Sequence, residues 1–394
     1  VIIGAGGAGL SVGAILASKE HKRVLVVERE EEIGGRLVSF VGKKRAVSLL
    51  GRELNVQGFQ DALRAVNTWV VRSKPDLPIL IEQGFLDGYT FEAGVHATFW
   101  ENKGRVGCLL DYLGKHIDLP GNKGYAIVDP KDNKWYRVEK RAKYGWMTDE
   151  AFEETKRLLR EMASLSLPEA EKYDLMSVGQ WLKERTRNRQ VYEYMAALAS
   201  IHMSISEPDR QPFGDFVRFM IIARDIGMDL TTGSTGTGPN PGFIQIAVKL
   251  AEVVRENGGE ILLGTPVEEV IIEDKKAKGV KVQTKTGRQK VEAECVVCTV
   301  PIKRIFTIIP ERHFPPDFVK KIEERYWDVA MLSGYTGLKR NIIEDKDVNP
   351  KSWIVMPSII KADEGYIGDV DIVMFMSSNF APTRSPEGKH LWEF

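Results

Sequence analysis

The N-terminal residues alternate between short apolar runs and a segment with helical spacing. Three apolar residues open the chain, apolar positions between Leu10 and Ala17 recur at helical intervals, and a second apolar run covers Val24–Val27. Two short runs of β-branched residues separated by a helix predict parallel neighbouring strands. This stretch therefore predicts a β-α-β unit at the start of the chain.

A later segment, residues 240–287, predicts one helix followed by short strands. Asn240 can cap the helix, Pro241 suits its first turn, and Gly258 is placed to end it. Short alternating runs follow, with a Thr-Gly turn between two of them. We expect an antiparallel meander after the helix.

The middle of the chain predicts a mainly helical cap. Amphipathic or buried helices are expected over residues 149–165, 177–188, 191–205 and 213–228. Soft apolar residues either line a pocket for a long apolar substrate or form the core of the cap; they are Met195, Met203, Met220, Met228, Phe216, Phe219 and Ile221. The glycine-rich loop 229–242 is either a linker or a segment near the cofactor.

Glycines interrupt the first apolar run in the order G-x-G-x-x-G. Gly4 permits a tight turn, Gly6 lets the backbone approach a pyrophosphate, and Gly9 allows close packing of helix on strand. The helix N-terminus then offers free N–H groups to phosphates. At the end of the second strand, Glu28 suits a ribose hydroxyl and disfavours NADP. Together these features predict a dinucleotide-binding domain.

A Gly-Gly-Arg turn follows the acidic residue, and a plain nicotinamide domain has no need for one. In this feature the chain resembles the superfamily of FAD-containing amine oxidases and phytoene desaturases. The segments DGYTFEAGVH, GTPVEEV and SPEGKH resemble further parts of that superfamily, although Glu92 stands where its members usually have aspartate. The segments DGYTFEAGVH and SPEGKH are more similar to the phytoene desaturase and carotenoid isomerase or saturase branch than to the amine oxidases proper.

The resemblance implies FAD as the cofactor and assigns contacts to it. The residues implied are Gly4, Gly6, Gly7, Ala8, Gly9, Glu28, Arg29, Gly34, Gly35, Arg36, Gly94 and Val267. Arg36 suits an anionic diphosphate, with a surface arginine as the alternative, and Val267 is expected beside the adenine. His96 is the one catalytic candidate: it either orients the flavin ring or relays a proton, or it makes a structural hydrogen bond. The six histidines show no metal-ligand spacing, so no metal is expected.

The implied fold class is α/β: a Rossmann-like FAD-binding domain with a second α+β substrate or cap domain, in the glutathione-reductase-like two-dinucleotide-fold class. We expect residues 1–110 and 236–302 to form the FAD-binding domain, and residues 111–235 and 303–394 to form the cap domain. Residues 37–86 exceed the short link usual in the superfamily and are interpreted as an insertion. The C-terminal part that closes over the flavin in relatives is expected to be missing here or supplied by another chain.

Within the predicted insertion, a helix is expected near residues 58–71. Phe59, Leu63, Val66 and Val70 have helical spacing, and Trp69 lies beside them. A helix that packs on the core is the default interpretation, and a helix that binds a membrane surface or a partner is the alternative.

The charge balance and the cysteine content indicate which partners and which compartment to expect. Lys plus Arg and Asp plus Glu are equal at 55 each, which gives no argument for a nucleic-acid partner. The three cysteines do not form a disulfide framework, which favours a reducing, cytoplasmic compartment. Cys295 and Cys298 have redox or zinc spacing but are interpreted as ordinary buried cysteines, because strand alternation points them apart. No apolar run is long enough to span a bilayer.

Three functions are weighed. The leading hypothesis is an FAD-dependent oxidoreductase that transfers a hydride between a C–H bond of a lipophilic, isoprenoid or polyene substrate and the flavin, as a desaturase or saturase. The second is a flavin amine oxidase, which predicts an aromatic cage. The third is a non-catalytic carrier of lipids or prenylated proteins, of the GDP-dissociation-inhibitor type. Peripheral membrane contact and a homo-oligomer are further expectations.

Overall fold

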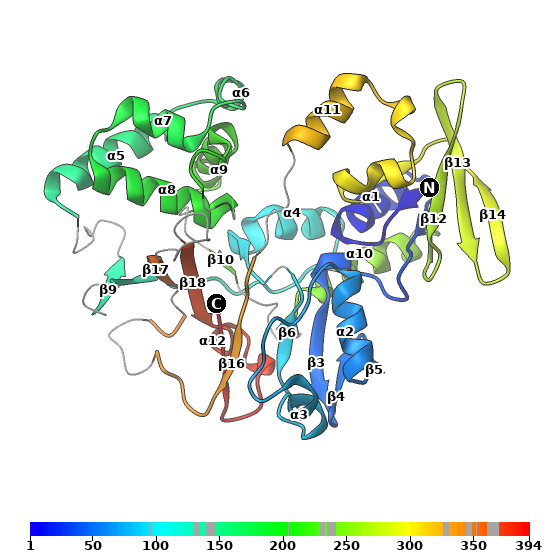
Figure 1. Cartoon of the computed structure of the whole chain (residues 1–394), viewed down its shortest axis with the longest axis horizontal. Coiled ribbons are helices and arrows are strands. Elements are labelled where there is room, and N and C mark those ends of the chain that lie inside the picture. The colour runs from blue at the N-terminus through cyan, green and yellow to red at the C-terminus, as the bar shows by residue number, and fades with distance from the viewer. Residues whose placement is uncertain are drawn as a thin grey trace.

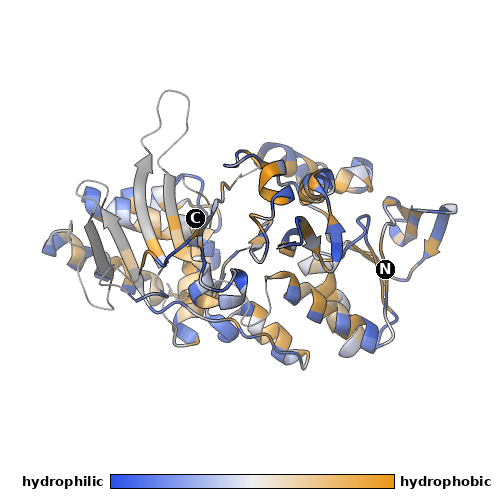
Figure 2. Ribbon diagram, turned by 90° about the horizontal axis from the view of Figure 1, so that it is seen from below, coloured by the Kyte–Doolittle hydropathy of each residue, from blue (hydrophilic) through white to orange (hydrophobic). Residues whose placement is uncertain are grey.

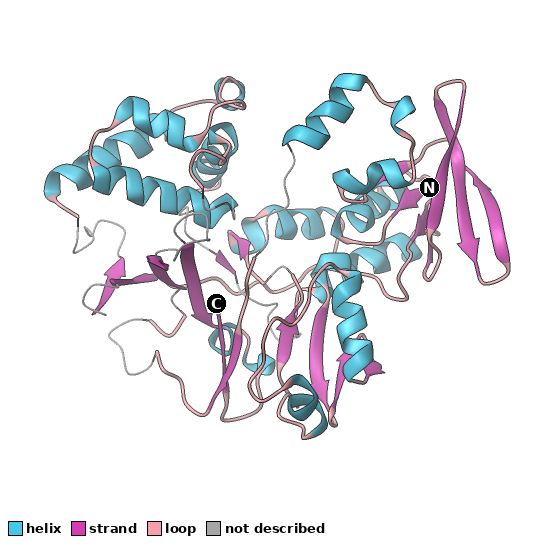
Figure 3. Cartoon of the chain, viewed as in Figure 1, coloured by secondary structure: helices cyan, strands magenta, loops and turns pink. Residues whose placement is uncertain are grey.

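The computed structural model describes residues 1–94, 96–129, 134–138, 147–203, 205, 207–228, 233–234, 242–325, 331–343, 349–351, 353–360 and 370–394. Figure 1 shows a group of helices at the upper left and a long antiparallel ribbon at the far right, near the N-terminus. Figure 3 shows the larger sheets between and below them. Asn240, Pro241 and most of the loop 229–242 lie outside the described residues.

A four-stranded parallel sheet forms the centre of the first domain, in the order β11-β2-β1-β15. Its strands are β1 (Ile2–Ile3), β2 (Leu25–Val27), β11 (Glu260–Leu262) and β15 (Val297–Cys298). Helices α1 (Gly7–Ser18) and α10 (Ile244–Glu256) pack against each other beside it. A Cβ on Gly13 would lie 3.3 Å from Ile2, Val26 and Val254, so α1 is in close contact with both the sheet and α10. The predicted β-α-β unit is confirmed.

An antiparallel meander follows α10, as predicted. Its strands are β12 (Val267–Glu273), β13 (Lys276–Thr284) and β14 (Gly287–Glu292). The turn between β13 and β14 ends at Gly287, whose φ of 116° is in the region that favours glycine. Gly258, which is placed just after α10, has a φ of 76° and ends the helix as the sequence predicts.

Residues 37–86 and the strand after them form a second, antiparallel sheet with two helices. The sheet order is β5-β4-β3-β6. The elements are β3 (Ser39–Lys43), β4 (Ala46–Leu49), β5 (Arg52–Leu54), α2 (Val56–Ala65), α3 (Leu77–Glu82) and β6 (Thr90–Glu92). Phe59 and Leu63 of α2 are buried in the main core, so the core-packing interpretation of this helix is confirmed.

The predicted extension of this helix to Val70 is wrong. After α2, the N–H of Asn67 donates to the carbonyl of Arg64 and the N–H of Thr68 to that of Leu63, each at 2.9 Å. Asn67 has a φ of 60°, so these two bonds make a Schellman motif. The chain therefore leaves the helix, and Val70 lies in an exposed loop.

A six-stranded mixed sheet forms the base of the second domain, in the order β16-β19-β18-β17-β8-β9. The strands are β8 (Tyr125–Asp129), β9 (Lys134–Val138), β16 (Tyr335–Leu338), β17 (Trp353–Ile360), β18 (Val370–Met376) and β19 (His390–Glu393). β17 pairs with β8 in parallel, and the other neighbours are antiparallel.

Five helices cover one side of this region, and Figure 2 shows them striped in blue and orange, as amphipathic helices should be. They are α5 (Asp149–Ala163), α6 (Leu167–Glu171), α7 (Val178–Arg185), α8 (Arg189–Met203) and α9 (Phe213–Asp225). Thr148 and Ser177 cap α5 and α7 through their hydroxyl groups. The four helices predicted here are confirmed.

The soft apolar set divides between the two interpretations. Met195, Phe216, Met220 and Ile221 are buried in the core of the cap around Trp181. Phe219, Met203 and Met228 are partly exposed. Four of the seven residues are therefore core, and these three are not fully buried.

The predicted burial of Cys295 and Cys298 is wrong for Cys295, which is exposed, whereas Cys298 is half buried. Cys108, for which no burial was predicted, is also exposed. β15 begins only at Val297, so Cys295 lies in the turn before the strand, where alternation between faces does not apply. Within the described ranges, no cluster of His, Cys, Asp and Glu is arranged to hold a metal ion.

The remaining elements are short connections. They are β7 (Thr98–Phe99), β10 (Gly233–Ser234), α4 (Arg105–Tyr112), α11 (Pro316–Arg325), α12 (Ser377–Phe380), and the 3₁₀ turns η1 (Gly35–Leu37), η2 (Glu101–Lys103), η3 (Ile302–Thr307), η4 (Glu311–His313) and η5 (Pro382–Arg384). In the part of the chain that the structure describes, no helix combines the length and apolar character needed to cross a membrane.

Candidate functional site

The glycine loop between β1 and α1 is shaped by close backbone contacts. Gly4 has a φ of 103°, and a Cβ on Gly9 would lie 1.9 Å from the carbonyl oxygen of Gly4. Only glycine at position 9 therefore lets α1 begin so near the strand. A Cβ on Gly6, in contrast, would meet nothing closer than 3.9 Å, so the space in front of this residue is open.

The N-terminus of α1 is suited to an anion. Gly6 is the N-cap, no side chain caps the helix, and its first turn contains no acidic residue. Ala8 is exposed and Gly7 is partly exposed. Uncapped N–H groups and the positive end of the helix dipole both favour a phosphate here, so these residues fit a dinucleotide diphosphate.

The Gly-Gly-Arg turn lies directly against the glycine loop. The N–H of Gly34 donates to the carbonyl of Ala5 at 2.9 Å, and a Cβ on Gly35 would lie 3.2 Å from the Cα of Gly6. Gly34 and Gly35 have φ values of 118° and 54°. The fold thus brings the two glycine motifs together, although 28 positions separate Gly6 from Gly34.

Arg36 lies at the edge of this site and is free to bind an anion. Its side chain is exposed and forms no ion pair with any described residue. A Cβ on Gly94 would lie 2.6 Å from the carbonyl oxygen of Arg36, so the segment that leads to His96 passes immediately beside this arginine. Gly94 and Arg36 therefore lie side by side.

Glu28 and its neighbour Arg29 have different surroundings. The carboxylate of Glu28 accepts the N–H of Ala5 at 2.6 Å and that of Glu30 at 3.0 Å. The carbonyl of Glu28 accepts the N–H of Thr265, two residues before Val267. Glu28 therefore contacts the glycine loop directly, and Val267 follows a segment that is bonded to Glu28. Arg29 instead donates to the carbonyl of Ala65 and pairs with Glu30, so its guanidinium is already engaged in holding α2.

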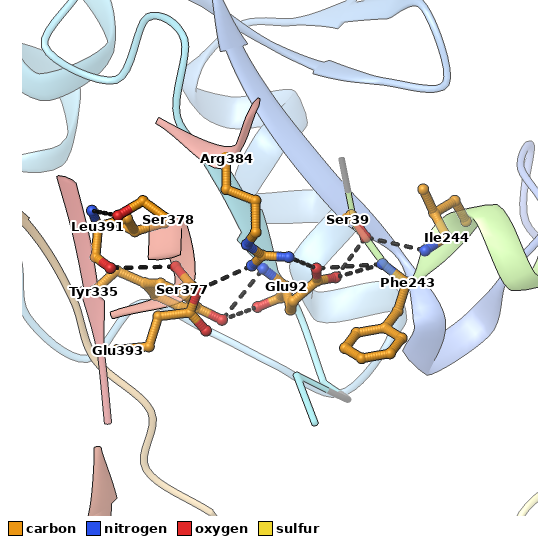
Figure 4. Close-up of polar contacts among 10 residues, drawn as sticks. All are labelled: Ser39, Glu92, Phe243, Ile244, Tyr335, Ser377, Ser378, Arg384, Leu391 and Glu393. Atoms are coloured by element: carbon orange, nitrogen blue, oxygen red, sulfur yellow. Dashed lines mark hydrogen bonds and ion pairs between the residues drawn. The ribbon is translucent and has the colours of Figure 1, made fainter. Parts of the chain in front are cut away.

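A buried cluster of charges, which the sequence did not predict, lies between β6 and the end of the chain (Figure 4). Arg384 donates from Nη1 to Glu92 at 2.5 Å and from Nη2 to Glu393 at 2.9 Å. The three side chains are at most 1 % exposed. We call them the Glu92–Arg384–Glu393 cluster. One guanidinium thus holds two carboxylates through separate N–H groups whose directions are fixed by its planar geometry.

The cluster also fixes the start of α10. Ser39 donates to the carboxylate of Glu92, which also accepts the N–H of Phe243 at 3.3 Å. The hydroxyl of Ser39 accepts the N–H of Ile244 at 3.1 Å. The Tyr335 hydroxyl contacts both backbone groups of Glu92. Strand β6, the start of helix α10 and the six-stranded sheet therefore meet at the carboxylate of Glu92.

The cluster holds one more negative than positive group. Burial raises the pKa of Glu92 even though Arg384 lowers it, and burial likewise raises the pKa of Glu393. Burial opposes the charge of Arg384, but the two carboxylates outweigh it and raise its pKa. Because a buried charge without a partner is costly, we conclude that the cluster retains a proton more readily than free carboxylates do.

His96 lies four residues after Glu92, beside the six-stranded sheet. Its Nδ1 is buried and has no hydrogen-bond partner among the described residues, while the residue as a whole is partly exposed. Burial lowers its pKa, with opposing contributions from Glu92 and Arg384. The imidazole is therefore neutral at neutral pH, and the structural hydrogen bond weighed for it is not made by Nδ1.

A run of aromatic side chains extends from His96 into the cap. We call it the aromatic wall, and it consists of Phe99, Trp100, His202, Phe219, Trp353 and Phe375. His96 meets Phe375 edge-on with ring centroids 6.0 Å apart, and Phe99 stacks on His202 at 5.2 Å. Trp100, Trp353 and Phe375 are buried, whereas Phe99, His202 and Phe219 are partly exposed.

The described part of the glycine-rich loop joins this wall. Gly233 and Ser234 form β10, which pairs with Phe99 and Thr98 of β7. These two residues of the loop thus pair with the strand that follows His96 by two positions. Sequence reasoning noted Phe219 and His96 but missed the other members, because they come from elements far apart in the chain.

The chain is similar to one protein family and to several solved structures. The family model described as flavin containing amine oxidoreductase matches residues 8–393. The chain matches none of the curated proteins. All of the chain aligns with each of three solved structures. An oxidoreductase from Methanosarcina mazei is 15% identical, with a TM-score of 0.68 and 77% of its length covered. A mutant of putrescine oxidase is 14% identical (TM-score 0.59, 73% covered), and a Rab GDI from Plasmodium falciparum is 12% identical (TM-score 0.51, 80% covered).

The solved structures share the α/β fold with a parallel sheet and a second domain, which confirms the predicted fold class. The family match extends over almost the whole chain and confirms an FAD-dependent oxidoreductase at this level of detail. It does not distinguish the desaturase branch from the amine oxidases. The chain belongs to the family of flavin-containing amine oxidoreductases.

Proposed function

We propose that this flavin-dependent oxidoreductase transfers a hydride between FAD and a C–H bond of an uncharged, lipophilic substrate, as a desaturase or saturase does. The observation that carries the proposal is the partly exposed part of the aromatic wall, formed by Phe99, His202 and Phe219. The buried rings of Trp353 and Phe375 connect it to His96. Aromatic and apolar surface binds extended hydrocarbon chains, and the wall itself includes no carboxylate that would attract an amine.

The cofactor would be held by the two glycine motifs. We assign the diphosphate to the N–H groups of Gly7 and Ala8 and to Arg36, the ribose to Glu28, and the adenine to the side of Val267. When bound, FAD supplies the hydride chemistry. The chain then has to bind the substrate, exclude water and position His96, whose neutral imidazole can accept or donate a proton.

The amine oxidase remains the second candidate, because the aromatic wall is also the feature that an amine oxidase requires. The two candidates differ in substrate charge. Putrescine is oxidised by one structural relative of this chain, as the name of that enzyme states. An amine substrate would have to lose its proton and bind among aromatic rings, whereas a polyene would bind without that cost.

The experiment begins with the purified full-length protein. We expect an oxidised-flavin absorption spectrum and release of FAD on denaturation. Anaerobic mixing with isoprenoid hydrocarbons should bleach the flavin, or a polyene should reoxidise the reduced flavin, while putrescine does neither. Bleaching by amines alone would refute the proposal in favour of the second candidate. A colourless protein that does not take up FAD would instead favour a carrier of the GDP-dissociation-inhibitor type.

A pair of variants tests the aromatic wall directly. F219A removes a partly exposed ring of the wall, and F152A removes a partly buried ring of the cap outside the wall. We expect F219A to raise the KM for the substrate while FAD content stays unchanged, and F152A to leave the KM alone. Equal effects of the two variants would show that the wall does not bind substrate.

A further inference from the structure

The loop between α2 and α3 exposes an unusual amount of apolar surface. We call residues 66–76 the Trp69 loop. Trp69 is 62% exposed, Val70 37% and Val71 71%, so three large apolar residues in succession face solvent. Ile79 and Phe85, which follow in α3 and the next turn, are 40% and 53% exposed. Isolated exposed apolar residues are common, but a contiguous group marks a binding surface.

Basic residues follow the apolar group immediately. Arg72 and Lys74 are exposed, and neither forms an ion pair with any residue that the structure describes. A hollow beside them is lined by Gln60, Val70, Val71, Arg72, Ser73, Lys74, Asp76 and Leu77. The recess next to the protruding apolar residues thus has two cationic groups, one carboxylate, one amide and one hydroxyl around it, and carries a net positive charge. This pairing of apolar and basic groups is complementary to the acyl region and the anionic headgroups of a bilayer.

Hydrogen bonds hold the base of the loop in place. The hydroxyl of Thr68 donates to the carbonyl of Ala93 at 2.9 Å, and the guanidinium of Arg29 donates to the carbonyl of Ala65 at 3.0 Å. The apolar residues therefore stand on a fixed support and do not fold back onto the core. Ala93 precedes Gly94, so this support is part of the segment that leads to His96.

We propose that the Trp69 loop docks the protein on the surface of an anionic lipid bilayer. Trp69 and Val71 enter the interfacial region, where tryptophan is favoured, while Arg72 and Lys74 contact the headgroups. The proposal is independent of the substrate assigned above, since it depends only on the exposed loop. It places the membrane next to the cofactor segment rather than at the helical cap.

Vesicle flotation of the full-length protein tests the proposal. We expect the protein to float with vesicles that contain phosphatidylserine and to float less with phosphatidylcholine alone or at high salt. Loss of one basic contact weakens binding by about fivefold, so the variant R72E/K74E should lose at least roughly 30-fold in affinity for the anionic vesicles. The variant W69A/V71D should lose binding to both kinds of vesicle.

The control variant is L175D, because Leu175 is 89% exposed on the cap and is not near the Trp69 loop in sequence. L175D should float like the wild type. Circular dichroism and the FAD content should be unchanged in all variants, since the altered side chains are exposed. Wild-type protein that stays in the soluble fraction, or variants that float like the wild type, would overturn the proposal. A dimer that forms without vesicles and is abolished by W69A/V71D would assign the surface to a second copy instead.

Discussion

Replacing Arg384 with methionine would remove the cation that two buried carboxylates share. The side chain is 1% exposed, and methionine keeps its apolar stem without its charge. Glu92 and Glu393 would then face each other in a dry interior without compensation. Breaking a buried ion pair by removing one partner costs roughly 3–5 kcal/mol of unfolding free energy. We expect a loss in this range at about pH 8, where free carboxylates are ionised.

The stability loss caused by R384M should depend on pH, and the direction follows from the pKa values of the two carboxylates. Both carboxylates have a raised pKa in the folded protein, so the folded state holds protons that the unfolded state has already released. Over the pH range in which the folded state holds more protons than the unfolded state, the unfolding free energy falls as the pH rises. R384M should raise both pKa values further. Its loss of stability should therefore be smallest near pH 5, where the carboxylates can take up protons, and largest near pH 8.

Urea unfolding, followed by circular dichroism at both pH values, measures this effect. R288M is the matched control, because the side chain of Arg288 is 77% exposed and pairs with Glu268 at the surface. It should cost less than about 1 kcal/mol. E393Q should cost less than R384M, since it leaves one carboxylate for one guanidinium. If R384M unfolded like R288M at both pH values, the argument from buried charge would be wrong.

Three further predictions test the glycine loop, His96 and the cap. G6A should fold normally but bind less FAD, because its Cβ enters the open space in front of the loop. G9A should also be destabilised, because its Cβ would lie 1.9 Å from the carbonyl oxygen of Gly4. Measurements of FAD content and melting temperature check both variants. H96Q should lose less stability than the wild type as the pH falls below 6.5, because burial lowers the pKa of His96 and the unfolded chain gains a proton there first. W181A should lose roughly 3–5 kcal/mol, measured by denaturation, because this ring is buried and stacks on Phe213, while FAD content is retained.

The cofactor loop could be predicted because its constraints are local. The turn at Gly4, the close contact of Gly9 and the position of Glu28 all follow from a strand, a turn and a helix in direct succession. The same holds for α10, which Gly258 ends, and for the meander after it. In each case a residue of special conformation marks the boundary within a few positions of the pattern it ends.

The end of α2 shows where a local signal was overlooked. Apolar spacing continues as far as Val70, yet the two hydrogen bonds of the Schellman motif stop the helix at Ala65. Asn67, which adopts the left-handed conformation there, is the residue type that most often replaces glycine at this position. Apolar periodicity alone therefore placed Trp69 on a helix, whereas the structure places it in an exposed loop.

The Glu92–Arg384–Glu393 cluster had no such signal. Arg384 and Glu92 are 292 positions apart, and the sequence around Arg384 is polar and rich in turn-forming residues, so nothing local indicates a buried side chain. Only the approach of the last strand to β6 removes these charges from water. Because the same carboxylate of Glu92 accepts the N–H of Phe243, Arg384 is coupled to the first turn of α10 as well as to the segment that carries His96. Residues at the far end of the chain thus hold the strand from which the segment with His96 continues, and the loss of any one charge of the cluster would leave a buried charge without its partner.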